Sequence, residues 1–311
     1  MQIGMTLPSM VAGLDRKAIL AWCRGVDEGP FSSLACGERI TFHNGEMRTL
    51  LSAAAALTER VRIVPTLYVL PLHPTALVAK EVATLDVLSN GRVTLTVGVG
   101  GREHDYRAAE KPFARRFARL DEQVQELRRL WAGEPPFAGA DPVGPRPVQP
   151  GGPPLWAGAM GAKSLRRAAA WAEGVAGFST AGDPAEVATA FEAVRAAWRE
   201  AASERKPAEP ARREPQASEV PRLVTGFWYA LGADAEERLE RYVYEYLRIF
   251  GEKPARAMAE RCRIASVDRF RECVEAIAAL GADELILVPT SADPAELDRT
   301  LDALSGCAGR S

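Results

Sequence analysis

The sequence has few of the residues that build metal centres and disulfide frameworks. Its 311 residues include five cysteines, without a CxxC pair, and three histidines, none of them in an HExxH motif. Widely spaced cysteines in odd number predict reduced thiols, and isolated histidines do not predict a metal site. We expect no metal, and we expect most cysteines to pack as small hydrophobic residues: Cys23, Cys36, Cys262, Cys273 and Cys307.

An excess of one charge and long apolar runs are also missing. The 39 Lys and Arg residues against 41 Asp and Glu residues leave a formal net charge of -2, so a nucleic acid or an anionic membrane is not the expected partner. No apolar run reaches the roughly 20 residues of a membrane-spanning helix, and the start MQIGMTLPSM has no signal-peptide pattern. We expect a cytoplasmic protein that acts on a small molecule.

What the sequence does have is alternation of short strand-like runs with longer helical patterns. This pattern predicts parallel βα units. Eight such runs in a chain of this length favour an α/β fold of the (β/α)8 TIM-barrel type, as a single domain over residues 1–311, rather than an open sheet. The expected strands are Ile3–Leu7, Phe31–Cys36, Val61–Tyr68, Arg92–Val99, Leu155–Gly158, Val175–Phe178, Leu223–Tyr229 and Glu284–Val288.

Three stretches interrupt this pattern. Residues 134–154, rich in proline and glycine, and the charged residues 203–220 are expected to be surface excursions. Residues 232–264 follow the seventh strand, at the face where TIM barrels carry their active sites. This segment contains Tyr242, Tyr244, Tyr246 and Phe250. It is expected to form a lid or pocket wall, or an amphipathic helix that packs on the barrel or on a second subunit.

Several familiar catalytic motifs fail. The cluster Gly98, Gly100 and Gly101 is not a dinucleotide fingerprint, because the third glycine of GxGxxG would fall on Glu103. No GxxxxGK[ST] motif exists, and the stretch GFSTA lacks the final glycine of a nucleophile elbow. No lysine ends an expected strand, which disfavours a Schiff-base aldolase.

One stretch of the sequence does predict a site, an anion site. The stretch WAGAMGAKSLRR, from Trp156, predicts a strand, a loop of small residues and a helix start with Lys163. The backbone amides of Gly158 to Ala162 and the charge of Lys163 would attract a phosphate. An ordinary βα loop is the alternative.

The glycine cluster after the fourth strand has two readings. A flat ring or its ribityl chain would need Gly98, Gly100 and Gly101 as bare backbone, and Arg102 could then reach an anionic group. Alternatively, these glycines only turn the chain.

Taken in order, four segments resemble the bacterial luciferase-like monooxygenases, a family of flavin-dependent oxidoreductases. The resemblance runs from Ile3 to about Val288. It implies a (β/α)8 barrel that binds FMN or the deazaflavin coenzyme F-420, often as a homodimer. The segments are HPTALVAKEVATLDVLSNGRVTLTVGVGG, RRFARLDEQVQELRRLW, RPVQPGGPPLWAGAMGAKSLRRAAAWAEGV and GADELILV.

The resemblance assigns two parts of the cofactor site. It makes the third strand, around Thr66 to Tyr68, the wall behind the ring, with a non-proline cis peptide expected at Thr66–Leu67. It also makes the segment from Gly158 the phosphate loop, with these residues nearest to the phosphate: Ala159, Met160, Gly161 and Lys163.

The sequence departs from the family at the end of the second strand. Relatives often carry Asp-His there, whereas this chain carries Glu38 and Arg39. Arginine cannot act as a base at neutral pH. Glu38 is therefore expected to position the substrate or orient Arg39, or else to form a plain salt bridge. His104 is the acid/base candidate, and Trp228 and Tyr229 are expected to line the substrate side.

These features predict a flavin-dependent oxidoreductase, a monooxygenase that uses reduced FMN and oxygen on a small organic substrate. NAD(P)H is the expected electron source, through a separate flavin reductase. Two alternatives stay open: a coenzyme F-420-dependent dehydrogenase or reductase on the same barrel, and a flavin-binding protein without catalytic activity.

Overall fold

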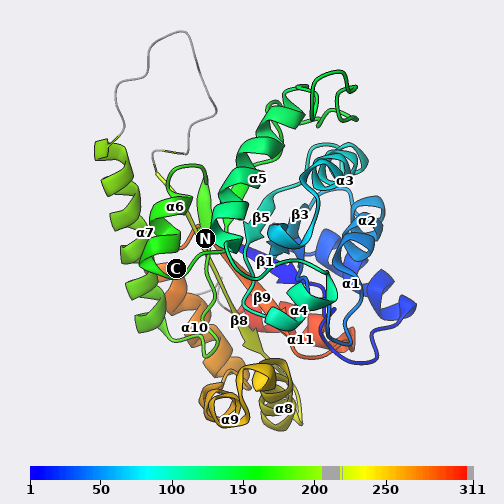
Figure 1. Cartoon of the computed structure of the whole chain (residues 1–311). Coiled ribbons are helices and arrows are strands. Elements are labelled where there is room, and N and C mark those ends of the chain that lie inside the picture. The colour runs from blue at the N-terminus through cyan, green and yellow to red at the C-terminus, as the bar shows by residue number, and fades with distance from the viewer. Residues whose placement is uncertain (205–217, 219, 307–311) are drawn as a thin grey trace.

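The computed structural model describes residues 1–204, 218 and 220–306, whose parallel strands curl into a nearly closed barrel (Figure 1). The sheet order is β3-β2-β1-β9-β8-β7-β6-β5-β4. The strands are β1 (Gln2–Thr6), β2 (Ser33–Cys36), β3 (Arg62–Pro65), β4 (Tyr68–Val69), β5 (Leu95–Gly98), β6 (Leu155–Ala157), β7 (Gly174–Ala176), β8 (Arg222–Tyr229) and β9 (Glu284–Pro289).

The third position of the barrel is shared by two short strands. β3 pairs with β2, and β4 pairs with β5. Only Thr66 and Leu67 separate β3 from β4, and a parallel bridge joins Ile63 to Val93 just before β5. The described strands therefore occupy eight positions around the barrel. All eight strands expected from the sequence are found, and the predicted TIM-barrel fold is confirmed.

Helices surround the strands on the outside. They are α1 (Arg16–Glu28), α2 (Met47–Leu57), the 3-10 turn η1 (Leu70–Leu72), α3 (Thr75–Leu88), α4 (Glu103–Ala108), α5 (Arg116–Trp131), α6 (Ala162–Ala168), α7 (Pro184–Glu204), α8 (Ala235–Leu247), the 3-10 turn η2 (Arg248–Phe250), α9 (Glu252–Arg261), α10 (Val267–Ala279) and α11 (Ala295–Ser305). Among the described residues, no helix is both long enough and apolar enough to cross a bilayer.

Strand residues alternate between two cores, as the pleat of a β-strand requires. The outer core lies between strands and helices and includes Leu223, Phe227 and Tyr229 of β8. The inner core fills the barrel with residues of five strands: Ala35, Val64, Trp156, Val224 and Ile286.

A polar cluster closes the amino-terminal end of the barrel. The buried Glu284 carboxylate forms an ion pair with Arg62 and accepts a 2.6 Å hydrogen bond from the Ser33 hydroxyl. Arg62 also lies 5.3 Å from the ring centre of Trp156. This end is filled, so open space is left at the carboxyl ends of the strands.

The segment 232–264 forms α8, η2 and α9, which lie together at one end of the barrel in Figure 1. The apolar side chains of α8 pack on Trp228 of β8 and on Met10, which follows β1. The segment therefore covers the barrel with its aromatic face.

The other two interruptions are residues 134–154 and 203–220. Residues 134–154 have no helix or strand, and many of them are exposed between α5 and β6. Within the charged stretch 203–220, residues 205–217 and 219 lie outside the described residues, as does Cys307. The described cysteines, at positions 23, 36, 262 and 273, are free and buried.

Candidate active site

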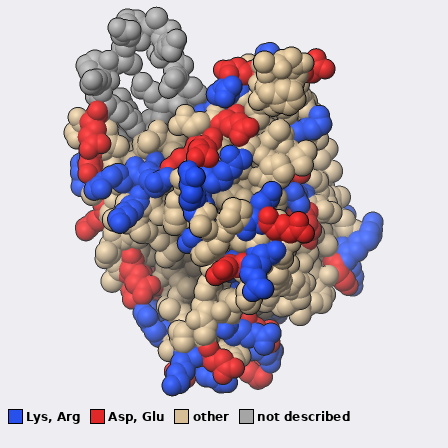
Figure 2. All heavy atoms as spheres, in the orientation of Figure 1, with Lys and Arg blue, Asp and Glu red and all other residues tan. Residues whose placement is uncertain are grey.

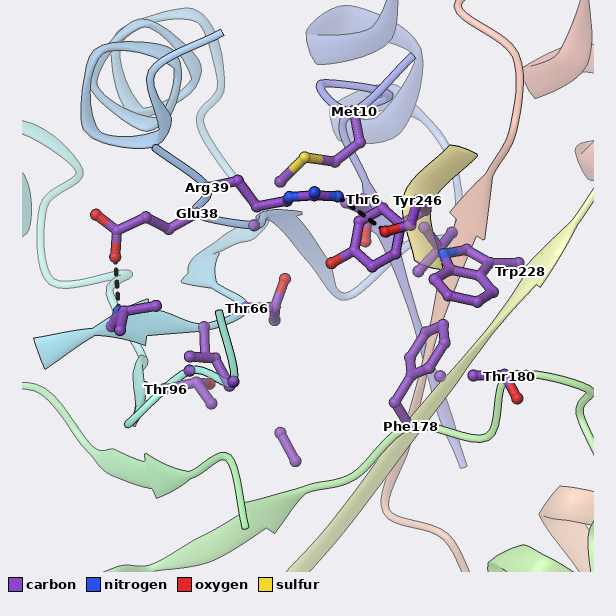
Figure 3. Close-up of a pocket in the computed structure, with 18 of the residues that line it drawn as sticks. Thr6, Met10, Glu38, Arg39, Thr66, Thr96, Phe178, Thr180, Trp228 and Tyr246 are labelled. Atoms are coloured by element: carbon purple, nitrogen blue, oxygen red, sulfur yellow. Dashed lines mark hydrogen bonds between the residues drawn. The ribbon is translucent and has the colours of Figure 1, made fainter. Parts of the chain in front are cut away.

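A cavity of about 370 Å³ opens at the carboxyl ends of the strands (Figure 3). Thr6, Thr96 and Val224 come from three strands, and Tyr246 and Phe250 come from the helical segment that covers the barrel. Most of the lining is apolar, with a few polar groups at the edges. Ligand sites of TIM barrels lie at this end, which makes this cavity the candidate active site.

The third barrel position, made of β3 and β4, borders the cavity. The peptide bond between Thr66 and Leu67, which join the two strands, is cis. This confirms the cis bond expected there, and both residues line the cavity.

The neighbouring glycines make room for this third strand. A Cβ on Gly98 would lie 2.9 Å from Leu67 Cδ2, and one on Gly158 would lie 2.3 Å from the same atom. Gly100 has φ of +61°, and a Cβ there would lie 2.9 Å from Val69 Cγ1. The cluster therefore lets Leu67 and Val69 approach the next strands. Of the cluster, Gly100 and Gly101 also border the cavity.

Glu38 and Arg39 follow β2, and their side chains turn in opposite directions (Figure 3). One Glu38 oxygen accepts a 2.6 Å hydrogen bond from the Val69 amide, and the other lies 2.7 Å from His73 Nε2. The expectation that Glu38 orients Arg39 is corrected, because both of its oxygens are occupied by the third strand and by His73. The ring of His73 is therefore its side-chain partner.

The Arg39 guanidinium borders the cavity and is only 6% exposed. Its carbon lies 3.6 Å from the ring centre of Phe42 and 4.5 Å from that of Tyr246. Nη1 donates a 3.3 Å hydrogen bond to the Tyr246 carbonyl, and Nε has no partner. Burial lowers the pKa of Arg39 to about 10, so the group is still a cation at neutral pH.

Arg102 and Asp105 form a second charged group on the same edge. Arg102 Nε lies 3.3 Å from Asp105 Oδ2, and Asp105 Oδ1 accepts hydrogen bonds of 2.7 and 2.6 Å from the amide and hydroxyl of Thr41. Both residues border the cavity. Burial lowers the pKa of Arg102.

Aromatic side chains form the wall next to Arg39. The Trp228 ring centre lies 4.9 Å from that of Phe178 and 5.1 Å from that of Tyr246, and all three residues line the cavity. Burial raises the pKa of Tyr246, so its hydroxyl stays neutral near pH 7. Trp228 therefore lies on the cavity side, as the sequence predicts.

Tyr229 does not lie there, which corrects the expectation. Neighbouring residues of a strand face opposite sides, so Tyr229 points into the outer core. It is fully buried, and its hydroxyl lies 2.7 Å from Thr300 Oγ1 of α11.

The structure does not bring His104 to the cavity. It is exposed on α4, and it is not among the residues that line the cavity. His73 does not line the cavity either, but its Nε2 contacts the cavity-lining Glu38. The described residues hold no cluster of three or more His, Cys, Asp or Glu residues that could share a metal ion.

The expected phosphate loop borders a second, smaller cavity of about 260 Å³. Ala159 and Met160 line it, and the two cavities share Gly177, Phe178 and Thr225. Met160 is 77% exposed, and Gly161 and Lys163 are exposed as well. Open space surrounds Gly161, since a Cβ there would meet nothing within 4 Å.

Sequence reasoning missed several polar residues of the cavity. The buried hydroxyls of Thr6 and Thr96 border it without a hydrogen-bond partner. A single threonine in a strand carries no spacing signal. The contact of Asp105 with Thr41 joins residues 64 positions apart, so only the fold reveals it.

The surface outside the cavity has mixed charge. Figure 2 shows acidic and basic side chains interspersed over the face drawn there. A parallel barrel with a largely apolar cavity at the carboxyl ends of its strands defines the class: a TIM-barrel protein with a candidate ligand site at its active-site face.

Comparison with known proteins identifies the family. Residues 1–284 match the family described as luciferase-like monooxygenase. The chain therefore belongs to the luciferase-like monooxygenase family, and the resemblance found in the sequence is confirmed.

The curated relatives match over a limited stretch. "Pyrimidine monooxygenase RutA" of Acinetobacter baylyi is 39% identical over 103 residues, which are 31% of this chain and 28% of the relative. The match thus spans less than a third of that relative's length.

Solved structures match over nearly the whole chain. Monooxygenase RslO1 from Streptomyces bottropensis has a TM-score of 0.73 at 22% identity, and an F420-dependent secondary alcohol dehydrogenase, solved with an F420-acetone adduct, has 0.75 at 18%; each comparison covers 98% of both chains. The oxygenating constituent of 3,6-diketocamphane monooxygenase from Pseudomonas putida, solved with FMN, has 0.65 at 16%, covering 98% of this chain and 97% of the other. These similarities show a shared fold.

Proposed function

We propose that this chain is a flavin-dependent monooxygenase that uses reduced FMN and O2 to oxidise a small organic substrate. The observation that carries the proposal is the pair of adjoining cavities, which share the wall at Gly177, Phe178 and Thr225. A flavin has a flat ring and a phosphorylated tail, and it needs two connected spaces. The larger cavity suits the ring. The smaller one is lined mainly by apolar residues and by Glu186, so the phosphate itself would lie outside it, at the exposed loop with Gly161 and Lys163.

The polar groups of the larger cavity fit a flavin ring. Buried hydroxyls are normally hydrogen bonded, whereas Thr6 Oγ1 and Thr96 Oγ1 have no partner. The edge of a flavin ring carries both donors and acceptors. Such a ring would supply the missing partners while its faces contact apolar side chains.

Separate parts of the chain take separate tasks in this proposal. Leu67, Gly100 and Gly101 hold the ring at the third and fourth barrel positions. Gly158, Ala159, Met160, Gly161 and Lys163 hold the phosphate. When bound, the reduced flavin supplies the electrons and activates O2.

Other residues at the cavity are assigned to water exclusion and to proton transfer. Trp228 and Phe178 exclude water from the substrate side. Glu38 lines the cavity, and its carboxylate lies 2.7 Å from His73 Nε2, within hydrogen-bond distance. Their position supports a role in proton transfer better than the exposed position of His104 does.

A coenzyme F-420-dependent dehydrogenase or reductase is the second candidate. The observation that favours it is the TM-score of 0.75 to a dehydrogenase solved with an F420 adduct. A cavity of this size and polarity accommodates a deazaflavin ring as well as a flavin ring.

Turnover separates the two functions. The purified protein is supplied with FMN, NADH and a flavin reductase in one arm, and with F-420 and no oxygen in the other, each with a substrate panel. Substrate-dependent product that requires O2 and reduced FMN supports the monooxygenase. Oxygen-independent change of the F-420 absorbance with a substrate would replace it by the second candidate. The molar mass of the same preparation in solution tests the predicted homodimer. Omission of the flavin reductase from the first arm tests whether a separate reductase is needed.

A further inference from the structure

The cavity edge next to β2 carries a buried cation without an acidic partner. Arg39 forms no ion pair with any described residue, and its Nε has no hydrogen-bond partner. Its guanidinium is held by the rings of Phe42 and Tyr246 instead. A buried charge without a counterion is costly, so an anionic group from outside the chain would stabilise this arrangement.

A second arginine on the same edge is also incompletely paired. Nη1 of Arg102 is buried without a partner, whereas Nε faces Asp105 Oδ2 at 3.3 Å. Nη2 donates a 3.4 Å hydrogen bond to the Thr41 carbonyl, in the loop that carries Arg39. Both arginines line the same cavity, and the charge of Arg102 helps to lower the pKa of Arg39.

The acidic groups of the cavity leave one positive charge unbalanced. Asp105 is the ion-pair partner of Arg102, and it also binds Thr41. Glu38 turns away from Arg39 and is occupied by Val69 and His73 (Figure 3). Two cations therefore share one nearby carboxylate, and a single negative charge would neutralise the edge.

We infer that the substrate is an organic carboxylate, whose carboxylate group is bound by Arg39 and Arg102 and whose apolar body packs on Trp228 and Phe178. The planar guanidinium fork matches the two oxygens of a carboxylate. The aromatic wall, including Tyr246, borders the same cavity as the arginines. The assignment to substrate rather than to cofactor rests on the proposed function.

The cofactor phosphate has its own place in that function. The phosphate loop follows β6, and Arg39 follows β2, three positions away around the barrel. Arg39 therefore remains free for the substrate when the flavin occupies the loop. Arg102 follows β5, next to β6, but its Nη2 donates to the Thr41 carbonyl in the loop that carries Arg39.

The test compares carboxylates with amides of the same shape. Calorimetric titrations use 3-phenylpropionate against 3-phenylpropanamide and hexanoate against hexanamide, with and without saturating FMN. We expect at least one carboxylate to bind about tenfold or more tighter than its amide, since a hydrogen-bonded buried charge contributes about that much. Arg39→Gln and Arg102→Gln are expected to abolish the preference, and Arg39→Lys to retain part of it.

The control removes an exposed cation close by. Arg107 lies on α4, is exposed and does not line the cavity, so Arg107→Gln should keep the preference. Thermal unfolding and circular dichroism of each variant show whether it is folded. If Arg39→Gln does not fold, the carboxylate and amide affinities of Arg102→Gln are compared instead.

The outcomes separate this inference from the proposed function. Equal binding of carboxylates and amides overturns the inference, as does a preference that survives both arginine variants. A loss of FMN affinity of tenfold or more in Arg39→Gln, or binding of inorganic phosphate that depends on Arg39, would assign the arginines to a phosphate and overturn it as well. If the carboxylate preference is found but neither FMN nor F-420 binds, the proposed function fails and the carboxylate site stands. Phenylmethanesulfonate distinguishes the carboxylate from a sulfonate, and tighter binding of the sulfonate contradicts the inference.

Discussion

Gly158 provides a sharp test of how the third strand shapes the cavity. A Cβ at Gly158 would lie 2.3 Å from Leu67 Cδ2, whereas nothing lies within 4 Å of a Cβ at Gly161 in the same loop. Because carbon atoms pack at about 3.5 Å or more, the Gly158→Ala substitution forces the tip of Leu67 to retreat by about 1 Å. Leu67 borders the cavity, so it has space to rotate.

The cost of Gly158→Ala follows from this geometry. Overpacking costs about 1–3 kcal/mol, and a flexible side chain next to open space places this case near about 1 kcal/mol. For a chain of this size, that corresponds to a fall of about 2 °C in Tm. The displaced Leu67 enters the space that the proposal gives to the flavin ring, so FMN affinity should fall by about tenfold or more, a larger effect than that on stability.

Thermal unfolding and FMN fluorescence titration measure the two effects. Gly161→Ala is the matched control for stability, and its Tm should equal that of the wild type. In a Leu67→Ala background, Gly158→Ala should no longer lower Tm, since the clashing atoms are gone. The reasoning is refuted if Gly158→Ala and Gly161→Ala behave alike, or if the loss persists without the Leu67 side chain.

Two further predictions concern the aromatic wall and the first turn of α2. Trp228→Ala should weaken binding of the preferred carboxylate by about tenfold or more and change FMN affinity much less. Tyr229→Phe should lower stability by about 1 kcal/mol through its lost hydrogen bond to Thr300 and leave both affinities unchanged. Calorimetry measures the affinities, and urea unfolding measures the stability. Burial alone would raise the pKa of the Glu46 carboxyl, but hydrogen bonds from Arg48 and from Thr49 lower it to about 2, from an ordinary value of 4.5. The stabilisation is therefore present above pH 4.5 and is lost as the pH falls towards 2. Glu46→Ala should lower the free energy of unfolding by about 1 kcal/mol at neutral pH. It should also make the free energy of unfolding, measured with urea, less dependent on pH between 4.5 and about 2. An unchanged pH profile would contradict the capping role.

The strand pattern in the sequence was sufficient to predict the barrel. Short strand-like runs such as Arg92–Val99 and Leu223–Tyr229 recur between longer helical patterns, so the βα repeat is visible in a single sequence. The alternation within β8 also shows that Trp228 and Tyr229 cannot both face the cavity, and that information was present in the sequence.

Other features of the site depend on tertiary contacts. The direction of Glu38 is set by the Val69 amide and by His73, more than 30 positions away along the chain. The glycine cluster could be recognised as a place of close approach, but the approaching group is Leu67 and not only a ligand. The unpartnered hydroxyls of Thr6 and Thr96 become visible only once the barrel is closed around them.

The affinity for reduced FMN tests the central claim most directly. Anaerobic fluorescence and calorimetric titrations of the wild type and of Gly161→Glu compare FMN with F-420. The proposed function predicts tight binding of reduced FMN to the wild type and its loss in Gly161→Glu, where a negative charge occupies the open space beside the phosphate loop. Absence of binding of either cofactor, or FMN binding that Gly161→Glu does not weaken, would contradict it.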